Sequence, residues 1–183
     1  FDKKYNFFEI FNDKTGAMLR SNVIISGKES VAPTMRSFPE LIDVGIMGHC
    51  HAANCNLCKN FGVDCYQSAH SIWRNNLNLH AFRRILDQSQ GRVFQIVLGG
   101  AGDPIKHEDF KEILYLTRKA GIVPNLTTTG FELTDNEAVC MGEHCGAVAV
   151  SFYSRLDKNL NETSNVPFDA VDSLLKAGCS VNI

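Results

Sequence analysis

Residues 93–104 read VFQIVLGGAGDP, a short apolar run that ends in a glycine-rich loop. Similar runs cover residues 41–46, 122–126 and 147–152, and another opens at residues 180–183. These runs are nearly continuous rather than alternating, which is typical of strands buried on both faces of a parallel sheet. The stretch at 93–104 therefore predicts the second of five parallel strands.

Helical patterns lie between these runs. Apolar residues recur at helical spacing in the segments 79–86, 110–114 and 168–175. Thr134 and Glu137 have the spacing of a capping box, which predicts the start of a further short helix. Strands and helices thus alternate along the chain, and this order predicts an α/β fold of right-handed βαβ units.

The first part of the chain does not follow this pattern. We predict a lead-in over residues 1–40 and the repeating core over residues 41–183. Residues 5–11 are rich in aromatic side chains, a turn follows, and residues 17–25 return as a second run. This sequence predicts an N-terminal β-hairpin.

The composition excludes several classes of protein. The 183 residues carry 18 basic and 20 acidic side chains, a net charge of −2, and 44% are hydrophobic. These values exclude a disordered chain, and the lack of a basic excess argues against binding to nucleic acid. No apolar run reaches the roughly 18–20 residues that a membrane helix needs. Residues 1–5 lack an apolar signal core, so we expect a cytoplasmic protein, although the sequence lacks an initiator Met and is expected to be a piece of a longer chain.

Cysteines are bunched in one loop. Four of the seven, Cys50, Cys55, Cys58 and Cys65, fall within 16 residues. An odd, bunched set indicates metal or redox chemistry rather than a disulfide framework. Thiolates can bind zinc or an iron–sulfur cluster. One short pair flanked by single cysteines favours a cluster over a structural zinc site, which usually pairs two short knuckles.

Three histidines and two further cysteines are also candidates for metal chemistry. His49 and His51 flank Cys50, and we expect them to support the site rather than to ligate metal, since the cysteines supply enough donors. Cys140 and Cys145 form a second candidate pair with His144. A helix-to-strand turn with buried thiols explains this pair better than a second metal site does.

Polar residues follow each predicted strand. The glycine loop carries Asp103 and has neither the Walker lysine nor the G-x-G-x-x-G spacing, so it suits an ammonium or hydroxyl ligand better than a phosphate. Residues 127–130 read TTTG, and Ser151, Tyr153 and Arg155 follow the fourth strand. Because the carboxyl ends of parallel strands share one edge, we expect these groups to meet the cysteine loop in space.

Taken in order, these motifs resemble the core of the radical S-adenosylmethionine (radical SAM) superfamily over residues 38–183. The resemblance is carried by the cysteine loop that ends in Cys65-Tyr66-Gln67, the glycine loop at residues 100–104, and residues 128–130. The family usually has Cys-x₃-Cys-x₂-Cys, whereas this chain offers Cys50-x₄-Cys55-x₂-Cys58 or Cys50-x₇-Cys58-x₆-Cys65. Asp103 stands where many members have Glu.

The resemblance implies a partial (βα)₆ barrel, of which this chain would end inside the fifth strand. It implies a [4Fe–4S] cluster held by three cysteines, with S-adenosylmethionine bound to the fourth iron. Reductive cleavage of that cofactor would give a 5′-deoxyadenosyl radical that abstracts hydrogen from a substrate, which we expect to be a peptide or protein. An electron donor such as flavodoxin or ferredoxin is implied as a partner.

The resemblance also assigns residues. It favours Cys50, Cys58 and Cys65 as the ligands, with Cys55 as the spare thiol, while the first of the two spacings stays open. By analogy, the cofactor would be bound by Tyr66, Gly100, Gly102, Asp103, Thr128, Thr129, Ser151 and Arg155. Within this set, Gly100, Gly102 and Asp103 would hold the methionine amino group and Arg155 the carboxylate. The alternative is a zinc- or iron–sulfur-binding α/β module without S-adenosylmethionine chemistry.

Overall fold

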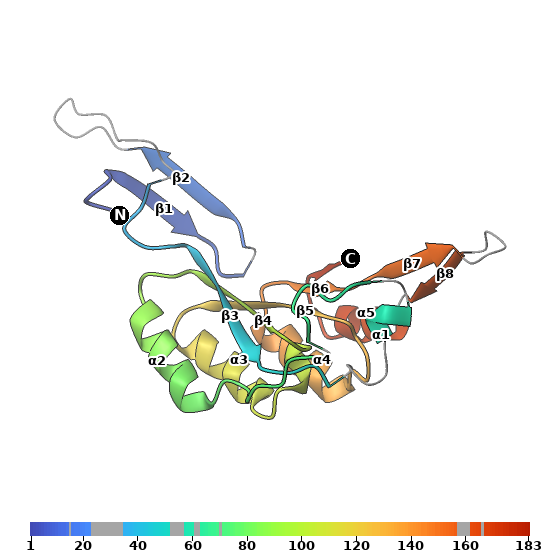
Figure 1. Cartoon of the computed structure of the whole chain (residues 1–183). Coiled ribbons are helices and arrows are strands. Elements are labelled where there is room, and N and C mark those ends of the chain that lie inside the picture. The colour runs from blue at the N-terminus through green and yellow to red at the C-terminus, as the bar shows by residue number, and fades with distance from the viewer. Residues whose placement is uncertain are drawn as a thin grey trace.

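The computed structural model describes residues 1–14, 16–22, 35–51, 57–60, 63–69, 71–156, 162–165 and 167–183. Its centre is a five-stranded sheet of order β3-β4-β5-β6-β9, in which every neighbouring pair is parallel. The strands are β3 (Leu41–Met47), β4 (Gln95–Gly100), β5 (Val123–Thr128), β6 (Val148–Val150) and β9 (Val181–Asn182). The alternating α/β order and parallel sheet expected from the sequence are confirmed (Figure 1).

Four helices cover one face of this sheet (Figure 1). They are α2 (Leu79–Ser89), α3 (Phe110–Lys119), α4 (Asp135–His144) and α5 (Phe168–Lys176). The expected capping box starts α4, because the Thr134 hydroxyl accepts from the Glu137 N–H and the Glu137 carboxylate accepts from the Thr134 N–H. The helices and the sheet enclose one apolar core, which includes Phe82, Ile96 and Leu114.

The opposite face of the sheet corrects the expectation that the strands are buried on both sides. Along β3, Val44 and Ile46 are buried against the helices, whereas Asp43 and Gly45, which alternate with them, are exposed. Thr127 on β5 is exposed in the same way. The helices therefore cover one face, and the other face lines a cavity, which explains why polar and small residues interrupt the apolar runs.

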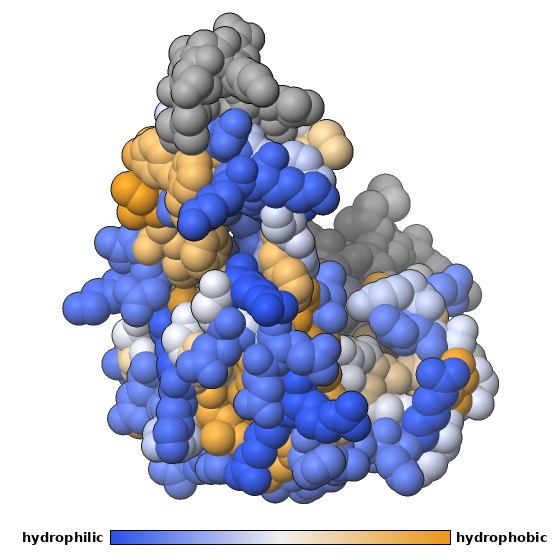
Figure 2. Space-filling model, turned by 90° about the vertical axis from the view of Figure 1, so that its left-hand side faces the viewer, coloured by the Kyte–Doolittle hydropathy of each residue, from blue (hydrophilic) through white to orange (hydrophobic). Residues whose placement is uncertain are grey.

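The N-terminal hairpin consists of β1 (Phe7–Phe11) and β2 (Met18–Asn22), which pair antiparallel as expected. Phe11 stacks on Phe94 at the entrance to β4, with ring centroids 5.2 Å apart. Arg20 lies between the carboxylates of Glu9 and Glu40. These contacts attach the hairpin to the start of the sheet. Its other face carries apolar side chains at the surface, including Ile10 and Leu19, which are 57% and 58% exposed. Figure 2 shows apolar surface in the upper part of the molecule.

Three elements were not expected from the sequence. A second antiparallel hairpin is formed by β7 (Tyr153–Leu156) and β8 (Glu162–Asn165), and it projects from the sheet next to β6 (Figure 1). A single helical turn, α1 (Leu57–Asn60), lies in the cysteine loop, and a 3₁₀ turn, η2 (Pro104–Lys106), follows the glycine loop. The two short, mostly polar strands lack the apolar pattern that marks a hairpin. Among the described residues, no helix has the length and apolar character to cross a membrane.

Candidate functional site

A cavity of about 950 Å³ lies at the carboxyl ends of the parallel strands. Three loops that are distant in sequence supply its walls: the cysteine loop after β3, the glycine loop after β4 and the threonine segment at the end of β5. Ser151 and Tyr153 close it beyond β6. The structure thus brings together most of the residues that the sequence singled out, namely Cys50, Cys58, Cys65, Tyr66, Gly100, Gly102, Asp103, Thr128, Thr129 and Ser151.

Two glycines allow the glycine loop to touch the cysteine loop. Gly100 has a φ of +124°, and a Cβ there would lie 2.3 Å from the carbonyl oxygen of Met47. A Cβ on Gly102 would lie 2.3 Å from the carbonyl oxygen of His49 and 3.1 Å from the Cα of Cys50. Any larger residue at position 102 would push the two loops apart, so the approach to the first cysteine requires glycine.

Three thiols face this cavity: Cys50 and Cys65, together with Cys58 on α1. Cys55 lies outside the described residues. The sulfurs of these three described cysteines do not all lie within 4.8 Å of one another; among the described residues, only His107, Glu108 and Asp109 have ligand atoms that close together. Thiolates that share one tetrahedral zinc lie about 3.8 Å apart, given a Zn–S bond of about 2.3 Å. The described thiols therefore lack the spacing of a shared zinc ion, whereas the thiolates of a cluster bind separate irons.

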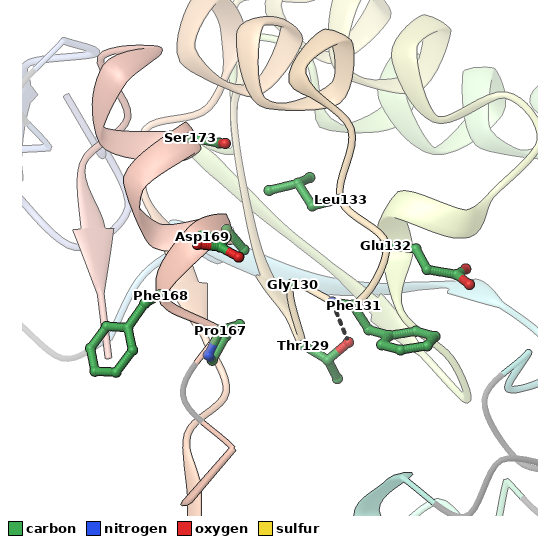
Figure 3. Close-up of a pocket in the computed structure, with 10 residues that line it drawn as sticks. Thr129, Gly130, Phe131, Glu132, Leu133, Pro167, Phe168, Asp169 and Ser173 are labelled. Atoms are coloured by element: carbon green, nitrogen blue, oxygen red, sulfur yellow. Dashed lines mark hydrogen bonds between the residues drawn. The ribbon is translucent and has the colours of Figure 1, made fainter.

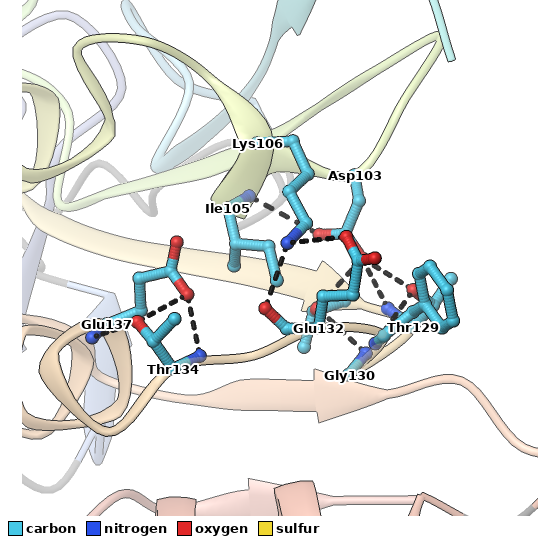
Figure 4. A network of polar contacts seen from close by, with 10 residues as sticks. Asp103, Ile105, Lys106, Thr129, Gly130, Glu132, Thr134 and Glu137 are labelled. Atoms are coloured by element: carbon cyan, nitrogen blue, oxygen red, sulfur yellow. Dashed lines mark hydrogen bonds and ion pairs between the residues drawn. The ribbon is translucent and has the colours of Figure 1, made fainter. Parts of the chain in front are cut away.

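Asp103 joins the glycine loop to the end of β5 (Figure 4). Its Oδ2 accepts three hydrogen bonds, from Thr128 Oγ1 at 2.9 Å, Thr129 N at 2.7 Å and Thr129 Oγ1 at 2.8 Å. Its Oδ1 accepts one longer bond, from Ile105 N at 3.3 Å. The carboxylate is 7% exposed, so these donors compensate for its burial. Of its two oxygens, Oδ1 has the greater capacity left for a ligand.

His51 carries the clearest unmet polar groups in the site. Both ring nitrogens are buried, and neither has a hydrogen-bond partner. Burial lowers the pKa of His51, an effect that the nearby Asp103 carboxylate opposes, so the ring is neutral at pH 7. A neutral imidazole offers one donor and one acceptor, and both here lie at the cavity without a protein partner. His49 differs, because it stacks on Trp73 with ring centroids 3.8 Å apart and its Nδ1 lies 3.2 Å from the Arg74 carbonyl oxygen.

Beyond β6 the expected and observed residues differ. Tyr153, which was not among the expected cofactor-binding residues, lines the cavity with its hydroxyl 4.0 Å from the sulfur of Cys58. Arg155 is two residues further along β7, where its backbone pairs with Thr163, and its side chain lies outside the described part of the structure. Tyr66 lines the cavity but is 91% exposed. Tyr153 is an aromatic residue just past the fourth predicted strand, so the sequence contained a signal for its place in the site.

A second cavity of about 490 Å³ lies between the loop before α4 and the start of α5 (Figure 3). Thr129 lines both cavities. Phe131 and Phe168 flank its opening, and Glu132 and Asp169 give it acidic groups. Its lining contains no cysteine or histidine, so the larger cavity is the stronger candidate for metal chemistry.

The remaining thiols and the His107 group are structural. Burial raises the pKa values of Cys140, Cys145 and Cys179, which keeps these thiols protonated and unreactive. Cys140 and Cys145 lie at the end of α4, where they are partly buried against the core, rather than fully buried as expected. His107 Nε2 donates to the Leu77 carbonyl at 3.0 Å, and its Nδ1 accepts from the Asp109 N–H at 3.0 Å. Both ring nitrogens are thus used by the backbone, and neither is available to a metal.

Comparisons with known proteins match this arrangement at the level of the fold. No family model matches the sequence, and no curated protein matches it. Among solved structures, that of Streptococcus suis SuiB bound to precursor peptide SuiA matches 80% of this chain with a TM-score of 0.59 and 18% identity. That of native anSMEcpe with bound AdoMet and Cp18Cys peptide matches 80% with a TM-score of 0.51 and 17% identity.

The chain spans 32% of the length of SuiB and 42% of that of anSMEcpe. Both are radical SAM enzymes. At this level of identity the likeness concerns the fold alone, and it covers 80% of this chain in both comparisons. The chain therefore shares an α/β fold with these two structures, and in this chain the fold consists of a five-stranded parallel sheet preceded by an N-terminal hairpin.

Proposed function

We propose that this chain is the core of a radical SAM enzyme that acts on a peptide or protein. The observation that carries the proposal is the joint position of three thiols, the glycine loop and the Asp103–threonine network around one cavity. The fold alone does not require cysteines there. Their presence at the carboxyl ends of the strands is what the expected chemistry needs.

The residues present fit a [4Fe–4S] cluster and S-adenosylmethionine. Cys50, Cys58 and Cys65 supply three soft ligands from one loop, which leaves one iron open for the cofactor. The unpartnered nitrogens of His51 offer a donor and an acceptor beside them. When bound, the reduced cluster supplies the electron that cleaves S-adenosylmethionine to methionine and a 5′-deoxyadenosyl radical, which abstracts hydrogen from the substrate.

The chain's own residues would bind and orient the cofactor. Asp103 holds Thr128 and Thr129 through Oδ2, and its Oδ1, which accepts only from Ile105 N, would offer an additional acceptor to the ammonium group of the cofactor. The close backbone approach at Gly100 and Gly102 keeps the two loops in contact beside the thiols. We assign Ser151 to the methionine and ribose side of the cofactor, Arg155 to its carboxylate, and Tyr66 to the exposed rim of the cavity.

A peptide or protein substrate is supported by the two structural neighbours. SuiB was solved with its precursor peptide SuiA, and anSMEcpe with a Cp18Cys peptide. We further propose a flavodoxin or ferredoxin as the electron donor, and the cytoplasm as the compartment, because a reducing environment keeps the cysteines available.

The test is anaerobic reconstitution with iron and sulfide, followed by assay for 5′-deoxyadenosine in the presence of reductant and S-adenosylmethionine. We expect a brown protein with about four irons per chain and formation of 5′-deoxyadenosine. Cys58→Ala is expected to lose iron and product, whereas Cys140→Ala, on α4 outside the cavity, is expected to keep both. A colourless protein that binds zinc instead would refute the proposal in favour of a zinc module.

A further inference from the structure

Tyr153 is placed where its hydroxyl can act on one of the thiols. It is the first residue of β7 and lines the cavity. Its hydroxyl oxygen lies 4.0 Å from Cys58 Sγ, although the two residues are 95 positions apart in sequence. The contact therefore exists because the fold brings the start of β7 to the helical turn α1 that carries Cys58.

The direction of this hydrogen bond depends on the state of the thiol. With Cys58 protonated, its S–H donates to the phenol oxygen. A cysteine that ligates iron is a thiolate and has no proton to donate, so the phenol O–H must then be the donor. A tyrosine phenol is ordinarily protonated at neutral pH, so it has an O–H to donate.

We propose that Tyr153 donates an O–H···S hydrogen bond to the Cys58 thiolate and thereby raises the reduction potential of the cluster that Cys58 holds. This inference rests on the proposed function, because it presupposes the cluster. Hydrogen bonds to ligand sulfurs are one of the means by which a protein sets the potential of an iron–sulfur cluster. A donor compensates for the additional negative charge of the reduced state, and so it makes reduction easier.

The geometry limits this role to Tyr153 among the described tyrosines near the site. Tyr66 also lines the cavity, but it is 91% exposed, so a hydrogen bond from it competes with water. Tyr153 is half-buried, where a charge-assisted hydrogen bond is stronger than in water. Tyr153 is a positioning residue, because it acts through the Cys58 thiolate and does not touch the substrate.

The experiment is a redox titration of the reconstituted cluster, followed by electron paramagnetic resonance of the reduced form. Wild type is compared with Tyr153→Phe, which removes only the hydroxyl, and with Tyr115→Phe, a half-exposed tyrosine on α3. We expect the reduction potential of the cluster in Tyr153→Phe to be more negative than in wild type. The shift corresponds to a decrease of up to about tenfold in the equilibrium constant for one-electron reduction. Tyr115→Phe should match wild type, and iron content and thermal unfolding should be the same in all three.

Equal potentials in wild type and Tyr153→Phe, with equal iron content, would overturn the inference while leaving the proposed function intact. A wild-type protein that assembles no cluster would overturn both. If Tyr153→Phe assembles no cluster, Tyr153→Leu is measured in its place, since it also removes the hydroxyl. Failure of both folded variants to hold iron would give Tyr153 a purely structural role and contradict the proposal.

Discussion

At the scale of single residues, Asp103 holds the threonine segment in its position in the site. One oxygen of its carboxylate accepts from both hydroxyls and one N–H of the threonine segment. Asparagine has the same shape but loses one acceptor and the charge, which leaves a buried donor unpaired. The substitution Asp103→Asn therefore separates the chemistry of this carboxylate from its size.

We predict that Asp103→Asn weakens binding of S-adenosylmethionine by about tenfold to a hundredfold, the effect of losing a hydrogen bond to a charged group. The cluster content should not change, because no thiol is altered. Calorimetric titration of the reconstituted protein measures the affinity. Asp87→Asn, at an exposed position on α2, is the matched control. Unchanged affinity in Asp103→Asn would remove Asp103 from the binding site.

The seven cysteines should differ in reactivity according to where the fold places them. Burial raises the pKa of Cys145, with the neighbouring thiols adding to the effect, so little thiolate exists at pH 8. In the cluster-free protein, we predict that iodoacetamide alkylates Cys145 at least about tenfold more slowly than Cys58 or Cys65, which face the cavity. Because the pKa is raised, the rate at Cys145 should still increase with pH above pH 9.

Peptide mapping by mass spectrometry, at several pH values at which the protein stays folded, measures these rates. Cys140 and Cys179, which also have raised pKa values, serve as internal references. Rapid alkylation of Cys145 at pH 8 would show that this thiol is accessible and that the helix-to-strand turn is not a closed part of the core.

At the scale of elements, the contact between the glycine loop and the cysteine loop controls the site. A Cβ at Gly102 would meet the His49 carbonyl, whereas a Cβ at Gly99, on the same strand and loop, would meet nothing within 4 Å. We predict that Gly102→Ala lowers stability by about 1–3 kcal/mol, as overpacking does, and lowers the iron bound on reconstitution. Gly99→Ala should be close to wild type in both.

Thermal or urea unfolding and iron analysis measure these effects. The two variants can be compared directly, because each adds one methyl group to the same segment. If Gly102→Ala binds as much iron as Gly99→Ala, the close approach of the two loops has no bearing on the cysteine site.

Local signals explain which elements could be predicted. The capping box at Thr134 and the strand at residues 93–98 are specified by neighbours in sequence, and the structure has both. The β7–β8 hairpin could not be predicted, because its short strands carry little apolar pattern and pair only with each other. The exposed face of β3 was not predicted, because Asp43 and Gly45 lie within a run that is otherwise apolar. In the structure these two exposed residues alternate with the buried Val44 and Ile46.

The site could be predicted in its composition but not in its contacts. Convergence of loops at the carboxyl ends of parallel strands follows from topology, and it placed the cysteines near Asp103 correctly in space. The bond between Tyr153 and Cys58 depends on the hairpin that the sequence did not reveal. The unpartnered ring of His51 likewise depends on which way a side chain turns, and no sequence pattern encodes that.

At the scale of the whole molecule, the chain is a parallel sheet with helices on one face and a thiol-lined cavity at one edge. It corresponds to about a third to less than half of its structural neighbours. The fold supplies the position of the cavity, and the sequence supplies its chemistry. We propose that a cluster held in this cavity binds S-adenosylmethionine at an open iron.

The most direct test is the electron paramagnetic resonance spectrum of the anaerobically reconstituted, reduced protein with and without S-adenosylmethionine. We predict a cluster signal that changes when the cofactor is added, because the cofactor binds the iron that lacks a cysteine ligand. The same change should be absent in Cys58→Ala. A cluster signal that is indifferent to S-adenosylmethionine, or a reconstituted protein without iron, would contradict the account.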